Sequence, residues 1–231
     1  MKFGEEFIPG RLIRRYKRFL ADVELESGEI ITAHCPNSGS MLTCDTPGSP
    51  VLLSVHDNPN RKYAFTWELV LVNSVWVGIN TQVPNRLVYE AIRAGEIPEL
   101  SDYPYVQRER SVSSHSRLDL MLSNDSDVCF VEVKNVTWVE DGVALFPDAK
   151  TERGTRHVLE LMKLKRQGNR SVMFFVIQRS DARLFAPADL VDAIYGKSLR
   201  QAHAQGVEIL PYLAQVTPQE ICLRNKLEFV F

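Results

Sequence analysis

Three residues on two predicted β-strands have the types and spacing of a metal-dependent hydrolytic site. In the strand expected over residues 117–122, leucines alternate toward one face and Asp119 points to the other. In the strand expected over residues 127–137, Glu132 and Lys134 are two positions apart and therefore share a face. If the short turn between these strands pairs them, Asp119 lies near Glu132.

Two carboxylates this close repel each other unless a cation neutralises them. A Mg²⁺ or Mn²⁺ ion bound by Asp119 and Glu132 would remove that repulsion, and Lys134 beside it would orient or help to deprotonate an attacking water. An acid followed by Glu-x-Lys on the next strand is the arrangement of phosphodiesterases of the restriction-endonuclease type. The alternative is structural: an Arg117–Asp119 pair and a Glu132–Lys134 pair on an exposed sheet face.

The helix expected over residues 151–167 adds a polar stripe beside this site. Arg153, His157 and Glu160 follow one another at the spacing of a single helix face. Directed along a carboxylate site, Arg153 and His157 would hold the scissile phosphate, Arg153 through a bidentate contact. A stripe of this spacing is also typical of a surface salt-bridge face, which is the alternative.

Two segments near the N-terminus interleave cations with aromatic rings. Residues 11–18 hold five cations and no acid, although the whole chain has 27 basic and 29 acidic residues and a net charge of −2. Cations that follow a phosphate backbone, with rings on which bases stack, are typical of barrels that bind nucleic acid. The residues predicted to contact DNA are Arg14, Arg15, Tyr16, Lys17, Arg18, Lys62 and Tyr63. Solvated basic faces are the competing interpretation, and Phe19 and Trp67 are expected in the core.

The hydrophobic pattern divides the chain near residue 82. Before it, short alternating segments predict strands and no convincing helix, which suits an all-β, five-stranded oligonucleotide-binding (OB) barrel over residues 1–82. After it, strands and helices alternate, and residues 172–177 are apolar on both faces, as in a central strand covered by helices. Residues 83–231 are therefore expected to form an α/β domain with a mixed sheet. Helices are predicted over residues 85–94, 151–167 and 187–204.

Composition excludes several classes of protein. The chain has 231 residues, of which 45% are hydrophobic and 24% charged, as in a globular protein rather than a disordered or coiled-coil one. No apolar run approaches the roughly 18 residues of a membrane span, and the acidic N-terminus is unlike a secretory signal, so a cytoplasmic location is expected. Four cysteines without a CxxC pair suit free thiols better than a disulfide framework or a zinc site. The absence of a helix-turn-helix or zinc-finger pattern argues against recognition of a specific operator.

Motifs in both halves of the chain resemble the sugar fermentation stimulation protein family (SfsA). They are the segments 14–23, 34–41, 131–137 and 146–149, followed by Thr151-Glu152-Arg153-Gly154, His157 and Glu160-Leu161. The resemblance implies an N-terminal OB barrel, a C-terminal domain with a PD-(D/E)XK nuclease core, non-specific DNA binding and a role in regulating maltose metabolism. On the nuclease pattern, Asp119, Glu132 and Lys134 match the two acids and the lysine, whereas Leu118 stands where the pattern has proline.

Three functions follow as hypotheses. The first is a DNA-binding protein with a Mg²⁺- or Mn²⁺-dependent nuclease site formed by Asp119, Glu132, Lys134, Arg153 and His157. The second is a DNA-binding regulator that keeps the nuclease fold as a catalytically silent scaffold, and the third is a small-molecule or protein-binding module. The sequence leaves open whether DNA is cut, which strand form is preferred and whether the chain forms a homo-oligomer.

Overall fold

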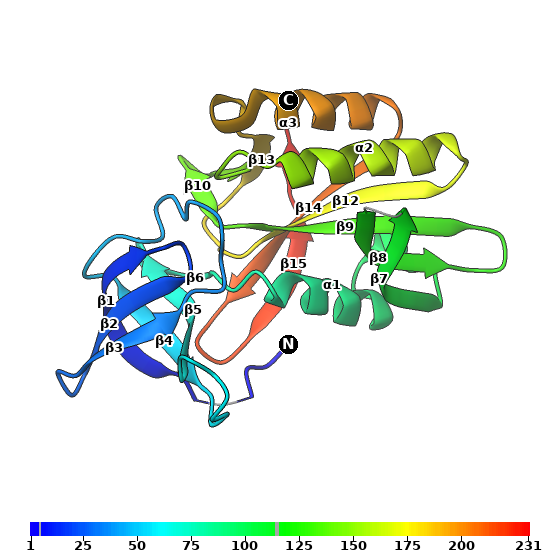
Figure 1. Cartoon of the computed structure of the whole chain (residues 1–231). Helices are drawn as coiled ribbons and strands as arrows, with labels where there is room; N and C mark the ends of the chain where they lie inside the picture. The colour runs from blue at the N-terminus through cyan, green and yellow to red at the C-terminus, as the bar shows by residue number, and fades with distance from the viewer. Residues whose placement is uncertain (5, 114–115) are drawn as a thin grey trace.

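The N-terminal half forms a barrel in the computed structural model, which describes residues 1–4, 6–113 and 116–231 (Figure 1). Its strands pair in the order β3-β2-β1-β4-β5-β6, and a parallel pairing of β3 with β5 closes a barrel of five strands, β1 to β5. The predicted OB-type architecture is therefore confirmed for this half, and β6 extends its edge. The strands are β1 (Ile8–Tyr16), β2 (Leu20–Leu25), β3 (Ile30–His34), β4 (Pro50–Val55), β5 (Phe65–Val72) and β6 (Val75–Gly78).

Two features of the barrel differ from the sequence-based expectation. The pattern does not predict β1, because the basic residues on its outer face obscure the alternation around Leu12, which is buried in the core with Trp67. Phe19 was expected in the core but is 48% exposed. Lys17 and Arg18 adopt positive φ in the turn that ends β1, and Phe19 follows them outside the alternation of β2.

The C-terminal half is built around a six-stranded mixed sheet of order β15-β14-β12-β9-β8-β7. Strands β9, β12 and β14 are parallel, while β7, β8 and β15 pair antiparallel. A smaller sheet of order β10-β11-β13-β16 lies beside it. The main strands are β7 (Tyr105–Ser113), β8 (Ser116–Ser123), β9 (Val128–Val136), β12 (Arg170–Ile177), β14 (Glu208–Val216) and β15 (Ile221–Lys226). The smaller sheet contains β10 (Trp138–Glu140), β11 (Val143–Phe146), β13 (Leu184–Pro187) and β16 (Glu228–Phe229).

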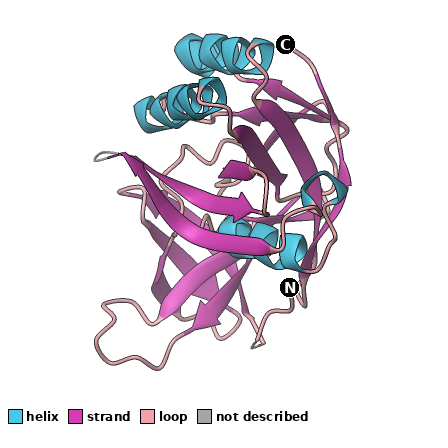
Figure 2. Cartoon of the chain, turned by 90° about the vertical axis from the view of Figure 1, so that its right-hand side faces the viewer, coloured by secondary structure: helices cyan, strands magenta, loops and turns pink. Residues whose placement is uncertain are grey.

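Helices cover both faces of the main sheet, with α1 on one face and α2 and α3 side by side on the other (Figures 1 and 2). The helices are α1 (Val83–Arg93), α2 (Glu152–Arg166), α3 (Asp189–Ala204) and a short 3₁₀ helix, η1 (Pro98–Leu100). Strand β12 is the predicted central strand: Phe174 packs in the cluster beneath α1, and Phe175 in the cluster beneath α2 and α3. Among the helices of the described ranges, none has the length and apolar character needed to span a membrane.

Buried hydrogen bonds fix the barrel against the α/β domain. The backbone N–H of Gly78, in β6, donates to the carbonyl of Gln178 at 2.9 Å. Arg179 is 1% exposed, and its guanidinium donates to the carbonyl of Thr137 at 2.8 Å and to the hydroxyl of Thr43 at 3.4 Å. Because backbone and buried groups make these bonds, the barrel loop that contains Thr43 is held at a fixed place over the α/β domain.

Candidate active site

Asp119 lies where β8 meets β9, the antiparallel pair that the sequence predicts. Its Oδ2 accepts a hydrogen bond from the backbone N–H of Val133 at 2.8 Å, and its Oδ1 accepts one from Asn85 Nδ2 at 2.7 Å. Asn85 is in the first turn of α1, so the carboxylate is fixed by both the sheet and a helix. Sequence reasoning missed Asn85, because its role depends on where α1 packs.

Glu132 is the most enclosed group of the site, with 2% of its side chain exposed. Its Oε1 contacts both Lys134 Nζ and His157 Nδ1, and the Lys134 and His157 nitrogens are 3.5 Å apart. Because a carboxylate faces Nδ1, that nitrogen of His157 carries the hydrogen. Oε2 of Glu132 is buried and has no hydrogen-bond partner among the described residues. One oxygen of this carboxylate is therefore held by the protein, and the other is unpartnered.

The two carboxyls have opposite pKa shifts. The pKa of Asp119 is raised to about 6, mainly by burial and then by the nearby Glu132 carboxylate, against the opposing effect of Lys134. Burial also acts to raise the pKa of Glu132, but the charge of Lys134 and the contact with His157 outweigh it and lower that pKa. At neutral pH the site thus holds two negative charges, one of which is poorly compensated by the protein itself.

This difference gives a measurable titration. We expect the carboxyl ¹³C resonance of Asp119, in metal-free protein, to titrate with a pKa of about 6 rather than near 3.8. Glu132→Gln should lower that pKa, because the variant removes the repelling charge. The raised pKa makes the fold less stable as the pH rises from 3.8 to about 6, the full effect remains above pH 6, and the effect is absent below pH 3.8, where both the folded and the unfolded protein carry the proton. A titration near 4 in the wild type would contradict the crowding of these two carboxyls.

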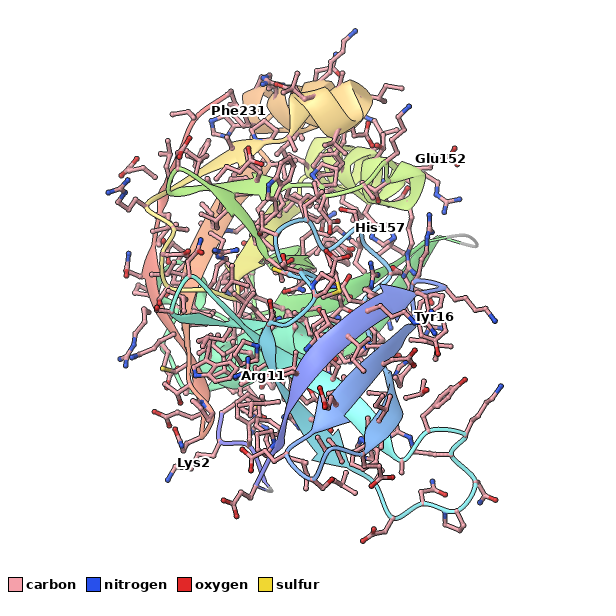
Figure 3. All side chains as sticks on the ribbon, turned by 90° about the vertical axis from the view of Figure 1, so that its left-hand side faces the viewer. Lys2, Arg11, Tyr16, Glu152, His157 and Phe231 are labelled. Carbon is pink, nitrogen blue, oxygen red and sulfur yellow. The ribbon has the colours of Figure 1, made fainter. Side chains whose placement is uncertain are left out.

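A cleft of about 430 Å³ opens above these groups. Its floor contains Asp119, Glu132 and Lys134, and its walls come from both halves of the chain. Arg18, in the turn between β1 and β2, lines the barrel side, whereas Arg153, in the first turn of α2, lines the other. Figure 3 shows Tyr16, at the end of β1, on the same side of the molecule as Glu152, the first residue of α2.

The donor atoms suit a hard cation. Among the described residues, no group of three or more His, Cys, Asp or Glu side chains is arranged to hold a metal ion. Two carboxylates are nevertheless enough to bind Mg²⁺, because this ion keeps several waters and takes further oxygen ligands from substrate phosphates. The unpartnered Oε2 of Glu132 and the raised pKa of Asp119 fit such a cation, which would sit between Asp119 and Glu132.

The two helix residues predicted to bind phosphate, Arg153 and His157, have different environments in the structure. Arg153 is exposed and lines the cleft, as a phosphate ligand would. His157 is 5% exposed, lies beneath the cleft and contacts Glu132, so its geometry suits positioning of that carboxylate rather than a contact with phosphate.

The residues of β1 and of the turn after it that were predicted to contact DNA have different environments. Arg14 is paired with Asp22 at 2.8 Å, and the hydroxyl of Tyr16 donates to the same carboxylate. Lys17 and Arg18 are exposed, and Arg18 enters the cleft. The second predicted pair stands apart from the cleft lining: Lys62 lies over the ring of Tyr63, with Nζ 5.6 Å from its centroid.

Arg15 is occupied by the protein's own backbone. Its guanidinium donates to the carbonyl oxygens of Asn37 at 2.9 Å, Gly39 at 2.7 Å and Ser40 at 3.2 Å. Its Nε also donates to the carbonyl of Arg18 at 3.2 Å, so this charged donor is bonded to four carbonyls. Three of them lie in the loop after β3, which makes Arg15 a structural clamp on that loop with few hydrogens left for a phosphate.

We expect Arg15→Ala to lower the free energy of unfolding by about 1–3 kcal/mol, because charge-assisted hydrogen bonds are lost. Lys17→Ala, two residues away and exposed, should change it by less than about 0.5 kcal/mol. Urea denaturation measures both. Equal, small effects would mean that Arg15 is free in solution and available to nucleic acid.

Comparisons with known proteins agree along the whole chain. The family model described as the SfsA N-terminal OB domain matches residues 13–79, and that of the sugar fermentation stimulation protein RE domain matches residues 82–220. The sugar fermentation stimulation protein homolog of Geotalea uraniireducens (strain Rf4) is 58% identical over 98% of both chains. The homolog of Geobacter metallireducens is 53% identical over 100% of both. The solved structure of Pyrococcus furiosus SfsA in complex with Ca²⁺ matches with a TM-score of 0.91 and 25% identity, covering 100% of this chain and 98% of that one.

Proposed function

This chain belongs to the sugar fermentation stimulation protein (SfsA) family, and from that premise we propose that it is a DNA-binding phosphodiesterase with a divalent-metal site at Asp119 and Glu132. The observation that carries the proposal is Glu132: a buried carboxylate held on one oxygen by Lys134 and His157 and unpartnered on the other, beside a second carboxyl at the floor of an open cleft.

The related Pyrococcus furiosus protein is described in complex with Ca²⁺. Ca²⁺, Mg²⁺ and Mn²⁺ all take oxygen ligands, so the two carboxylates of this chain suit Mg²⁺ or Mn²⁺ in the cell. When bound, such an ion supplies charge neutralisation of the phosphate and a more acidic water.

The protein residues have separate roles in this proposal. Asn85 and the backbone N–H of Val133 fix the carboxylate of Asp119. His157 fixes Glu132, while Lys134 Nζ, at the floor of the cleft, orients the attacking water and stabilises the charge that develops on the phosphate. Arg153, exposed at the rim, holds the phosphate by a bidentate contact.

The test is cleavage of single-stranded DNA, and of supercoiled DNA at its locally unpaired segments, by purified protein with Mg²⁺, Mn²⁺ or EDTA. We expect cleavage with either ion and none in EDTA, and a loss of about 10²-fold or more in Lys134→Met, because that variant removes the charge-stabilising group. Lys197→Met, on the exposed surface of α3, is the matched control and should cut like the wild type. Equal cleavage by wild type and Lys134→Met would contradict the proposed site. Binding of DNA without cleavage under any condition would favour the silent DNA-binding regulator.

A further inference from the structure

The cleft above the catalytic groups is small and lies between two parts of the chain. Its volume of about 430 Å³ is in the range of pockets that enclose one small ligand. Glu132 and Lys134, at its floor, have side chains only 2% and 15% exposed. A phosphodiester must therefore descend into the cleft to reach them, rather than contact them at the surface.

A bridge formed by Gly39, Ser40, Met41 and Asp148 joins the two walls. The hydroxyl of Ser40 donates to the carbonyl of Asp148, and the backbone N–H of Met41 donates to Asp148 Oδ2 at 2.8 Å. Gly39 lies so close that a Cβ there would be 2.5 Å from both carboxylate oxygens of Asp148. Arg15 holds the same loop from the barrel side. Because the loop is bonded on both sides, the walls are held together and a wide object cannot separate them without breaking these bonds.

Unpaired cations face the cleft from both walls. Arg18 comes from the barrel, Lys150 from the loop just before α2 and Arg153 from its first turn; all three are exposed. Within the described part of the chain, none of them is paired with a carboxylate. Cations on opposite walls contact one phosphate backbone from two sides, as in channels that bind single strands. In a duplex the second strand lies across a major groove about 12 Å wide. If one strand reached the floor of the cleft, the other would overlap one of its walls.

Resting on the proposed function, we infer that the substrate of this site is a single unpaired nucleic-acid strand that passes between Arg18 on one wall and Lys150 and Arg153 on the other. Fully paired duplex is excluded from the catalytic floor by the bridge. Unpaired tails and flaps of a duplex are accepted, because one strand there is free to enter.

The test compares one sequence as a labelled single strand, as a blunt hairpin duplex and as a duplex with a single-stranded flap. Affinity is measured by fluorescence anisotropy in EDTA, and cleavage with Mn²⁺. We expect tighter binding of the single strand and flap than of the duplex, and cuts confined to unpaired nucleotides. The double variant Lys150→Ala with Arg153→Ala should weaken single-strand binding about tenfold and lower the salt slope by about 2, because two phosphate contacts are lost.

Duplex binding should be unaffected by the double variant, and Lys197→Ala should change neither affinity. Cuts within paired duplex at the single-strand rate, or an equal loss of duplex and single-strand affinity in the double variant, would overturn the inference. If no substrate is cut, the proposed hydrolysis fails, but a single-strand preference that depends on Lys150 and Arg153 still supports the cleft as a single-strand channel.

Discussion

Glu132→Gln is expected to lower the rate of phosphodiester cleavage by about 10³-fold or more, because it removes a charge on which both the metal ion and the phosphate depend. The variant also leaves Lys134 and His157 facing a neutral amide in a buried place, where the carboxylate now contacts both. The free energy of unfolding should therefore fall by about 1–3 kcal/mol, less than for a fully buried ion pair because Lys134 keeps some solvent contact. Single-turnover cleavage and urea denaturation measure the two effects.

Two control measurements show whether the effect of Glu132→Gln is specific to the site. Glu220→Gln, an exposed glutamate, should cleave and unfold like the wild type. Binding of single-stranded DNA by Glu132→Gln in EDTA should equal that of the wild type, because the rim cations are untouched. A cleavage rate within about threefold of the wild type corresponds to a difference in activation free energy of less than about 1 kcal/mol. Such a result would show that Glu132 has no part in the mechanism.

His157→Ala is expected to raise the Mn²⁺ concentration needed for half-maximal cleavage by about 10–100-fold, the usual effect of removing a group that orients a metal ligand. His157 contacts Oε1 of Glu132 from α2 and is 5% exposed, so water replaces it poorly. Its loss leaves the carboxylate oriented by Lys134 alone. The measurement is the cleavage rate as a function of Mn²⁺ concentration.

His157→Gln provides the matched comparison, because its side-chain amide keeps an N–H that can donate to Glu132. We expect it to recover part of the Mn²⁺ affinity lost in the alanine variant. If both variants show a wild-type Mn²⁺ dependence but a lower affinity for DNA, His157 would be a phosphate ligand, as the helix pattern alone indicates.

The core of the site could be predicted because strand alternation is a local property. Asp119 is placed opposite a face of leucines, and Glu132 shares a face with Lys134, whatever the rest of the chain does. The central strand, residues 172–177, was predicted for the same reason, since both of its faces are apolar and buried.

The partners of these groups could not be predicted because they come from other elements. Asn85 reaches Asp119 only through the packing of α1. The helix pattern does place His157 at the site, but as a phosphate ligand, and its contact with Glu132 depends on how α2 packs. Arg15 has the residue type of a phosphate contact, but three of the carbonyls that occupy it belong to a loop more than twenty positions along the chain. Strand β7 was missed because it is an exposed edge strand, so its sequence carries no apolar alternation.

The most direct test of the metal site is anomalous diffraction from a crystal of the wild-type protein soaked with Mn²⁺. We expect one anomalous peak at the floor of the cleft, within about 2.0–2.4 Å of an oxygen of Asp119 and of Oε2 of Glu132. The peak should be lost in a crystal of Glu132→Gln prepared in the same way. A peak bound elsewhere in protein that cleaves DNA, with these two carboxylates free of metal, would contradict the account.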